Sequence, residues 1–172
     1  MSELGKIALD LLNNKDYSSL AELLKDKEDS EDSTIQYVLG CLYNLGIDRE
    51  KNINKAFELF YKSAHKCDPE GERALGIYYY LGNGTEVDTE KGLYWVKKAV
   101  DDGLVLALCT LAHIYMNGMG VEKDEHQGFL LYEEAYEKGN MHALEHLIEC
   151  YEKGIGVPID LKKANELKKR LY

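Results

Sequence analysis

Apolar side chains recur every three or four residues along most of this chain, which is the spacing of an amphipathic α-helix. Ala107, Leu111 and Tyr115, for example, lie four residues apart and share one face of a predicted helix. Gly118 predicts the end of that helix, because glycine adopts the left-handed conformation without steric cost. Asp124 predicts the N-cap of a second helix directly after the turn. The pattern therefore predicts a helical hairpin.

The hairpin pattern occurs four times with a period of 36 residues. Each copy has a leucine at the same core position: Leu39, Leu75, Leu111 and Leu147. The predicted units are a degenerate N-terminal helical hairpin that acts as a cap, 1–32, and four repeats, 33–68, 69–104, 105–140 and 141–172. Because neither helix of a hairpin can bury its apolar stripe alone, neighbouring units must stack. We therefore predict an all-α fold, a right-handed α-solenoid of helix-turn-helix hairpins.

The repeated motif resembles the Sel1-like repeat, a relative of the tetratricopeptide repeat. The second and third copies read LGIYYYLGNGTEVDTEKGLYWVKKAVDDG and LAHIYMNGMGVEKDEHQGFLLYEEAYEKG. The resemblance covers residues 33–172 and departs from the family pattern where Asp48, Cys67 and Ile148 replace glycines of the repeat. It implies a superhelical scaffold that binds other proteins, often in signalling, secretion or quality-control complexes.

The composition is that of a folded, soluble domain. The 172 residues include 31 acidic and 21 basic side chains, which give a formal net charge of −10, and 45% of the residues are apolar. No apolar run approaches the roughly 20 residues that a membrane span needs, and the first residues lack the features of a signal peptide. Because binding to phosphate backbones needs a basic surface, nucleic acid is not expected as the partner. We expect a cytoplasmic protein that binds neither nucleic acid nor membrane.

The resemblance also raises the question of disulfides, since secreted members of the family carry one bridge per repeat. Cys41, Cys67, Cys109 and Cys150 occupy four different repeat positions, so they do not form one pair per unit. Together with the expected cytoplasmic location, this spacing predicts reduced thiols.

Candidate partner contacts lie on the first helices of the hairpins, which line the concave face in solenoids of this kind. Positions that point away from the repeated leucine and tyrosine carry aromatic and apolar side chains first, and then histidine and glutamate. The candidate partner-binding residues are Tyr37, Arg73, Ile77, Cys109, His113, His142, Glu145, His146 and Glu149. We predict a non-enzymatic adaptor without a cofactor, whose partner is another protein that presents a basic or amphipathic peptide or helix.

Other classes of function remain open. His142 and His146 lie four residues apart on one helical face with glutamates nearby, which suits a zinc-dependent hydrolase chemically, although we predict no metal. Ser63 and Lys66 form the Ser-x-x-Lys motif of serine β-lactamases, but the companion motifs are missing. An immunity or anti-activator protein, which binds one partner tightly, fits the same sequence.

Two aromatic residues of the second repeat are predicted to belong to the core. Tyr94 and Trp95 fall on a second helix, at positions that Phe60, Leu131 and Leu167 hold in the other units. We therefore expect both rings to pack inside the protein and not to bind a ligand.

Overall fold

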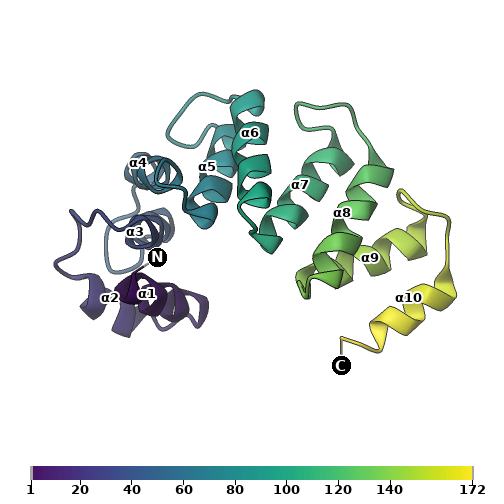
Figure 1. Ribbon diagram of the computed structural model, residues 1–172, viewed down its shortest axis with the longest axis horizontal. Helices are drawn as coiled ribbons and strands as arrows, with labels where there is room; N and C mark the ends of the chain where they lie inside the picture. Colours follow the sequence, from purple (N-terminus) through teal and green to yellow (C-terminus); the bar gives the residue numbers. More distant parts are fainter. Residues whose placement is uncertain (1, 172) are drawn as a thin grey trace. The chain divides into compact units, whose positions relative to one another are not determined.

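A computed structural model describes residues 2–171, which form ten α-helices and no β-strand (Figure 1). The helices are α1 (Glu3–Asn13), α2 (Tyr17–Leu24), α3 (Ser33–Leu45), α4 (Ile53–Ala64), α5 (Pro69–Leu81), α6 (Thr89–Asp101), α7 (Val105–Asn117), α8 (Glu125–Glu137), α9 (His142–Lys153) and α10 (Leu161–Lys168). The predicted all-α class is confirmed. Within the described range, no helix is both long and apolar enough to cross a membrane.

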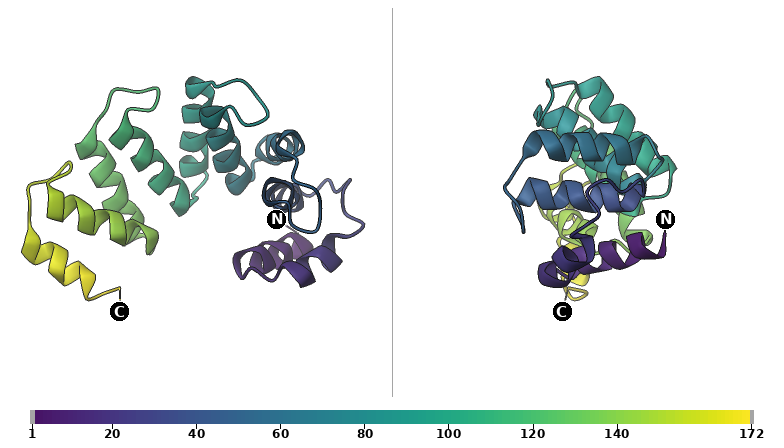
Figure 2. Two further views of the ribbon diagram at one scale, coloured as in Figure 1. Left: turned by 180° about the vertical axis from the view of Figure 1, so that it is seen from behind. Right: turned by 90° about the vertical axis from the view of Figure 1, so that its left-hand side faces the viewer.

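These helices group into two compact units, which are described separately. Unit 1 runs through Asp102 and contains α1–α6, whereas unit 2 starts at Gly103 and contains α7–α10. In both units the two helices of a hairpin pack side by side: α3 with α4, α5 with α6, α7 with α8 and α9 with α10 (Figure 2).

The turn inside each hairpin is bounded by the same pair of caps. The first helix ends at a glycine in the left-handed conformation, with φ between 64° and 73°: Gly46, Gly82, Gly118 and Gly154. The second helix begins after a side chain that accepts a hydrogen bond from the backbone N–H three residues later: Asn52, Asp88, Asp124 and Asp160. The backbone N–H of each of these caps also donates a 2.9 Å hydrogen bond to a tyrosine carbonyl of the first helix, which closes the turn. The four tyrosines share one repeat position: Tyr43, Tyr79, Tyr115 and Tyr151. The predicted roles of Gly118 and Asp124 are confirmed.

The repeated leucines form the core of the hairpins, and all four are buried. Glycines allow the two helices of a hairpin to approach closely in α5 and α6. A Cβ atom on Gly76 would lie 2.9 Å from the carbonyl oxygen of Gly92, and one on Gly92 would lie 3.1 Å from that of Gly76. The helices therefore meet backbone to backbone, and a larger residue at either position would force them apart.

Unit 1 contains two of the departures from the repeat pattern, and both residues adopt the backbone conformation that glycine has at the same position in later repeats. Asp48 and Cys67 stand where later repeats have glycine, and they adopt left-handed conformations with φ of 61° and 57°. This conformation costs a non-glycine residue about 1 kcal/mol. The first repeat therefore has the shape of the others at some cost in stability.

The N-terminal segment forms a hairpin of α1 and α2, and α1 packs on α3. Arg49, in the turn after α3, forms an ion pair with Glu28, which follows α2. The function of the α1–α2 hairpin as an N-terminal cap stays a prediction.

The structure contradicts one of the two core positions predicted for Tyr94 and Trp95. The Tyr94 side chain is 59% exposed, so the expectation of core packing is wrong for this residue. In the 36-residue register Tyr94 corresponds to Glu58 and Leu130, which are exposed as well. Trp95 is half-buried, and its ring centroid lies 4.9 Å from that of His65 on the preceding hairpin.

A buried ion pair joins α5 to α6. The Glu72 side chain is 0% exposed and pairs with Lys98, whose amino group also lies 2.7 Å from the Asp102 carboxylate. Oε2 of Glu72 has no hydrogen-bond partner among the residues that the structure describes. Burial raises the pKa of Glu72 more strongly than the neighbouring Lys98 lowers it.

We predict that Glu72→Leu stabilises unit 1, because Leu108 and Leu144 hold the equivalent positions and Lys98 keeps its ion pair with Asp102. The free energy of unfolding should increase by about 1 kcal/mol at neutral pH, since a buried and half-satisfied carboxylate is removed. Folding raises the pKa of Glu72, so the wild type gains stability as the pH falls, and the advantage of the variant should shrink from about pH 7 to about pH 5. Urea unfolding at both pH values measures this. An advantage that grows on acidification would contradict the prediction.

Candidate functional site

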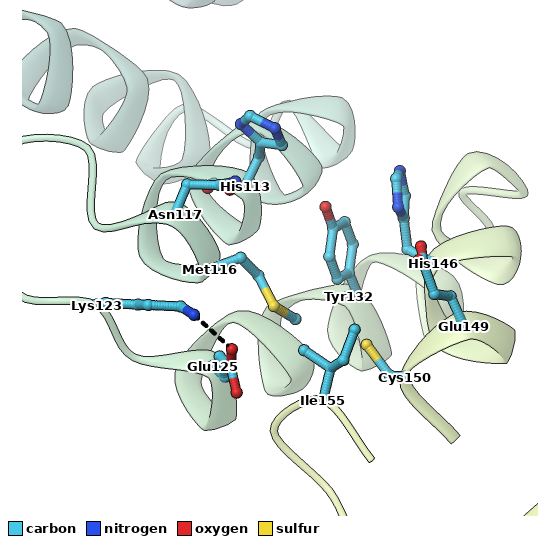
Figure 3. Close-up of a pocket in the computed structure, with 10 residues that line it drawn as sticks. All are labelled: His113, Met116, Asn117, Lys123, Glu125, Tyr132, His146, Glu149, Cys150 and Ile155. Carbon is cyan, nitrogen blue, oxygen red and sulfur yellow. Dashed lines mark hydrogen bonds and ion pairs between the residues drawn. The ribbon is translucent and has the colours of Figure 1, made fainter. Parts of the chain in front are cut away.

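A pocket of about 370 Å³ opens in unit 2 between α7, α8 and α9. Ten residues line this α7–α9 pocket: His113, Met116, Asn117, Lys123, Glu125, Tyr132, His146, Glu149, Cys150 and Ile155. Figure 3 shows Met116, Cys150 and Ile155 gathered on one side of the pocket, with His113 and His146 on the other. The pocket thus combines an apolar floor with a polar rim.

Helical spacing explains why these side chains meet. Two helices each contribute a trio at positions i, i+3 and i+4, which share one helical face. The trio of α7 is His113, Met116 and Asn117, and that of α9 is His146, Glu149 and Cys150. Figure 3 shows Tyr132 of α8 between the two trios, and its ring stacks on that of His146 with centroids 4.5 Å apart and an angle of 15° between the planes.

The electrostatics differ between floor and rim. Burial raises the pKa of the Tyr132 hydroxyl, and it raises the pKa of the Cys150 thiol to about 11, so both groups are neutral at physiological pH. On the rim, Lys153 lowers the pKa of Glu149, whose carboxylate lies 2.6 Å from the lysine amino group. The floor is therefore uncharged, while the polar lining carries the ionised carboxylate of Glu149 and an ion pair between Lys123 and Glu125, 2.6 Å apart.

The pocket contains three of the predicted site residues: His113, His146 and Glu149. Glu145 lies one turn away on α9, in a neighbouring hollow that Ile148, Lys168 and Leu171 also line. His142 is exposed at the start of α9, and Cys109 is half-buried on α7. Of the six unit 2 candidates, three therefore line the pocket, and the other three lie elsewhere on α7 and α9.

The three predicted residues of unit 1 have different surroundings. Arg73 is partly buried on α5, with its guanidinium 3.4 Å from the Glu70 carboxylate, and Ile77 is half-buried one turn later. Tyr37 is only 8% exposed, and its ring centroid lies 5.8 Å from that of Phe60. Tyr37 packs in the core and offers a partner little surface, because Phe60 and the buried α3 face enclose the ring.

Sequence reasoning missed the floor of the pocket, which Met116, Tyr132, Cys150 and Ile155 form. The signal was present three residues after each repeated leucine, where the repeats carry Leu42, Tyr78, Ile114 and Cys150. The sharp loss of side-chain volume from tyrosine to cysteine at this position indicates an unfilled space.

Neither motif behind the enzyme alternatives assembles a site. Among residues 2–171, no group of three or more His, Cys, Asp or Glu side chains is placed to hold a metal ion. Ser63 is buried, and its hydroxyl donates a 2.8 Å hydrogen bond to the carbonyl of Ser33. Lys66 is engaged elsewhere, in an ion pair with Glu31. The Ser-x-x-Lys motif therefore lies in packing and surface contacts.

Comparison with known families tests the resemblance to the Sel1-like repeat that the sequence pattern suggests. The Sel1 repeat profile matches residues 36–66, 69–104, 105–140 and 143–167, which is most of the chain. The chain belongs to the Sel1 repeat family. Sel1 repeat proteins are generally scaffolds for protein–protein interactions, and they are typically non-enzymatic.

Solved structures support the same fold. A Sel1 repeat protein from Oxalobacter formigenes is 23% identical, with a TM-score of 0.77 over 95% of this chain and 66% of its own length. A protective antigen of uropathogenic Escherichia coli strains, which displays the SLR fold, is also 23% identical, with a TM-score of 0.73 over 97% of this chain and 37% of its own length. The chain thus spans about two thirds of the first protein and little more than a third of the second. The predicted α-solenoid fold is confirmed.

Proposed function

We propose that this Sel1 repeat protein is a non-enzymatic adaptor whose unit 2 binds a peptide or helix of a partner protein at the α7–α9 pocket. The observation that carries the proposal is a pocket with a neutral apolar floor on a scaffold whose family mediates protein–protein interactions. Partner side chains that enter such pockets supply most of the binding energy in many interfaces.

The charge around the pocket supports a basic or amphipathic partner. Glu145 and Glu149 are exposed one turn apart on α9, and the whole chain carries a net charge of −10. Complementary charge on a partner would speed its association and orient it over the pocket. Lys153 offsets part of the charge of Glu149, so the apolar floor must supply much of the affinity.

The chemistry of the pocket argues for binding over catalysis. A buried thiol whose pKa is raised to about 11, as for Cys150, is a poor nucleophile because the thiolate is the reactive form. His113 and His146 line the pocket, but the thiol beside them is that of Cys150, which burial keeps protonated at physiological pH. All four cysteines are free thiols, which supports a cytoplasmic location.

Charge reversal on α9 tests the proposal. In a pull-down from the native host, the double variant Glu145→Lys, Glu149→Lys should retain at least about tenfold less of the bound partner than the wild type, because repulsion replaces attraction at the rim. Quantitative mass spectrometry of the captured proteins measures the ratio.

The matched control is Glu134→Lys with Glu137→Lys on α8, outside the pocket. It makes the same change in net charge, and Glu134 forms an i,i+4 ion pair with Lys138 just as Glu149 does with Lys153. The control should retain the partner. Equal loss in both variants, or no loss in either, would show that binding does not use the α7–α9 pocket.

A further inference from the structure

The space that forms the α7–α9 pocket in unit 2 is filled by a tyrosine in unit 1. Helices α3, α4 and α5 are related to α7, α8 and α9 by a shift of two repeats, or 72 residues. Tyr78 of α5 lies with its ring centroid 4.9 Å from that of Phe60 on α4. Its hydroxyl donates a 2.8 Å hydrogen bond to the side-chain oxygen of Asn44 on α3. The ring is buried, so unit 1 has a filled groove at this place.

Unit 2 keeps an aromatic ring and a long side chain at two walls of this space but lacks the Tyr78 ring. Phe60 corresponds to Tyr132, and Asn44 corresponds to Met116, both of which line the pocket. Tyr78 corresponds to Cys150, whose side chain lacks the six-membered ring. The position of the Tyr78 ring therefore has no aromatic side chain in unit 2, while His146, which stands where unit 1 has Ala74, stacks on Tyr132 beside it.

Resting on the proposed function, we infer that the α7–α9 pocket binds an aromatic side chain of the partner in the place that Tyr78 occupies in unit 1. His146 stacks on one face of Tyr132, so Tyr132 offers the incoming ring an edge-to-face contact such as Phe60 makes with Tyr78. The sulfur atoms of Met116 and Cys150 add favourable contacts with an aromatic ring.

The floor also discriminates between aromatic residues. The amide that accepts the hydroxyl hydrogen bond of Tyr78 is absent, because Met116 replaces Asn44. A hydroxyl that lies against Met116 has no strong acceptor there and loses its hydrogen bond to water, so phenylalanine should bind more tightly than tyrosine. Glu149 on the rim and Glu145 one turn away on α9 favour a basic residue next to the ring.

Short peptides test this inference without the native partner. Binding of Ac-Lys-Phe-Lys-NH2, Ac-Lys-Tyr-Lys-NH2 and Ac-Lys-Ala-Lys-NH2 to the full chain is measured by NMR titration, with the methyl groups of Met116 and Ile155 as reporters. The phenylalanine peptide should bind at least about tenfold more tightly than the alanine peptide, with the tyrosine peptide between them. Equal affinities for the phenylalanine and alanine peptides would overturn the inference.

Restoring the missing ring gives a second test. The double variant Cys150→Tyr, Met116→Asn reproduces the Tyr78–Asn44 pair of unit 1, so it should fold and should lose the preference for the phenylalanine peptide. The control Leu130→Tyr adds the same ring at an exposed position of α8, which corresponds to Tyr94 in the second repeat, and should keep the preference. Circular dichroism confirms the folding of both variants. A preference that survives in the double variant would overturn the inference.

The two proposals fail in different experiments. If the peptides bind as expected while the Glu145→Lys, Glu149→Lys variant retains every host partner, the aromatic specificity of the pocket stands and the adaptor function fails. If that variant loses its partner while the phenylalanine and alanine peptides bind equally, the adaptor function stands and the aromatic specificity fails.

Discussion

Replacing Gly156 by alanine should destabilise unit 2 by about 4 kcal/mol. Gly156 adopts φ of +71°, and a Cβ atom there would lie 2.1 Å from the carbonyl oxygen of Glu125 at the start of α8. The obstacle is backbone, so it cannot rotate away as a side chain would. The Gly156 carbonyl also lies 2.8 Å from Nδ1 of His126, and any displacement of the turn would break that contact. Urea unfolding followed by far-UV circular dichroism measures the loss.

Gly139→Ala is the matched control in the same unit. Its backbone has φ of +90°, but a Cβ atom there would meet nothing within 4 Å. The control therefore carries the conformational strain without the collision and should cost only about 1–2 kcal/mol. Equal losses for the two variants would show that strain, and not the contact with Glu125, decides the cost at Gly156.

Replacing Leu75 by alanine should destabilise unit 1 by about 3 kcal/mol, because it leaves a cavity in the core of α5 that the packed helices cannot close completely. The Leu75 side chain is 0% exposed, whereas Leu81 on the same helix is 58% exposed. Leu81→Ala is therefore the control and should change the stability by less than about 0.5 kcal/mol. Trp95 is the single tryptophan and belongs to unit 1, so its fluorescence during urea unfolding reports on this unit. Similar shifts for the two variants would contradict the assignment of the core.

The helical framework could be predicted from the sequence because it depends on local chemistry. Gly118 ends a helix and Asp124 starts one through interactions with their own neighbours along the chain, and the 36-residue period repeats these signals. Burial was harder to predict. An error of one residue in aligning a repeat turns the expected direction of a helical side chain by 100°. Tyr94 therefore lies on the exposed side of α6 and Tyr37 on the buried side of α3, each opposite to the expectation.

The candidate site could be predicted only in part. His113, His146 and Glu149 stood out as polar residues on first helices, and the structure places all three around one pocket. The floor was missed because a pocket depends on what is absent as well as on what is present. Cys150 on its own resembles an ordinary small core residue. Only the comparison with Tyr78, which fills the corresponding space in unit 1, shows that Cys150 leaves this space open.

The difference between Tyr78 and Cys150 has a consequence for how such a protein can evolve. The two residues occupy the same repeat position, and the glycine caps and the buried leucines that follow the repeat are the same around both. Under the proposed function, the position that shapes the pocket is distinct from the positions of the caps and leucines that build each hairpin. On that proposal, one or two mutations at such positions can open or close a pocket while the helices and turns stay intact. Duplicated repeats of this kind can therefore acquire new partners in small steps, without first losing a stable fold.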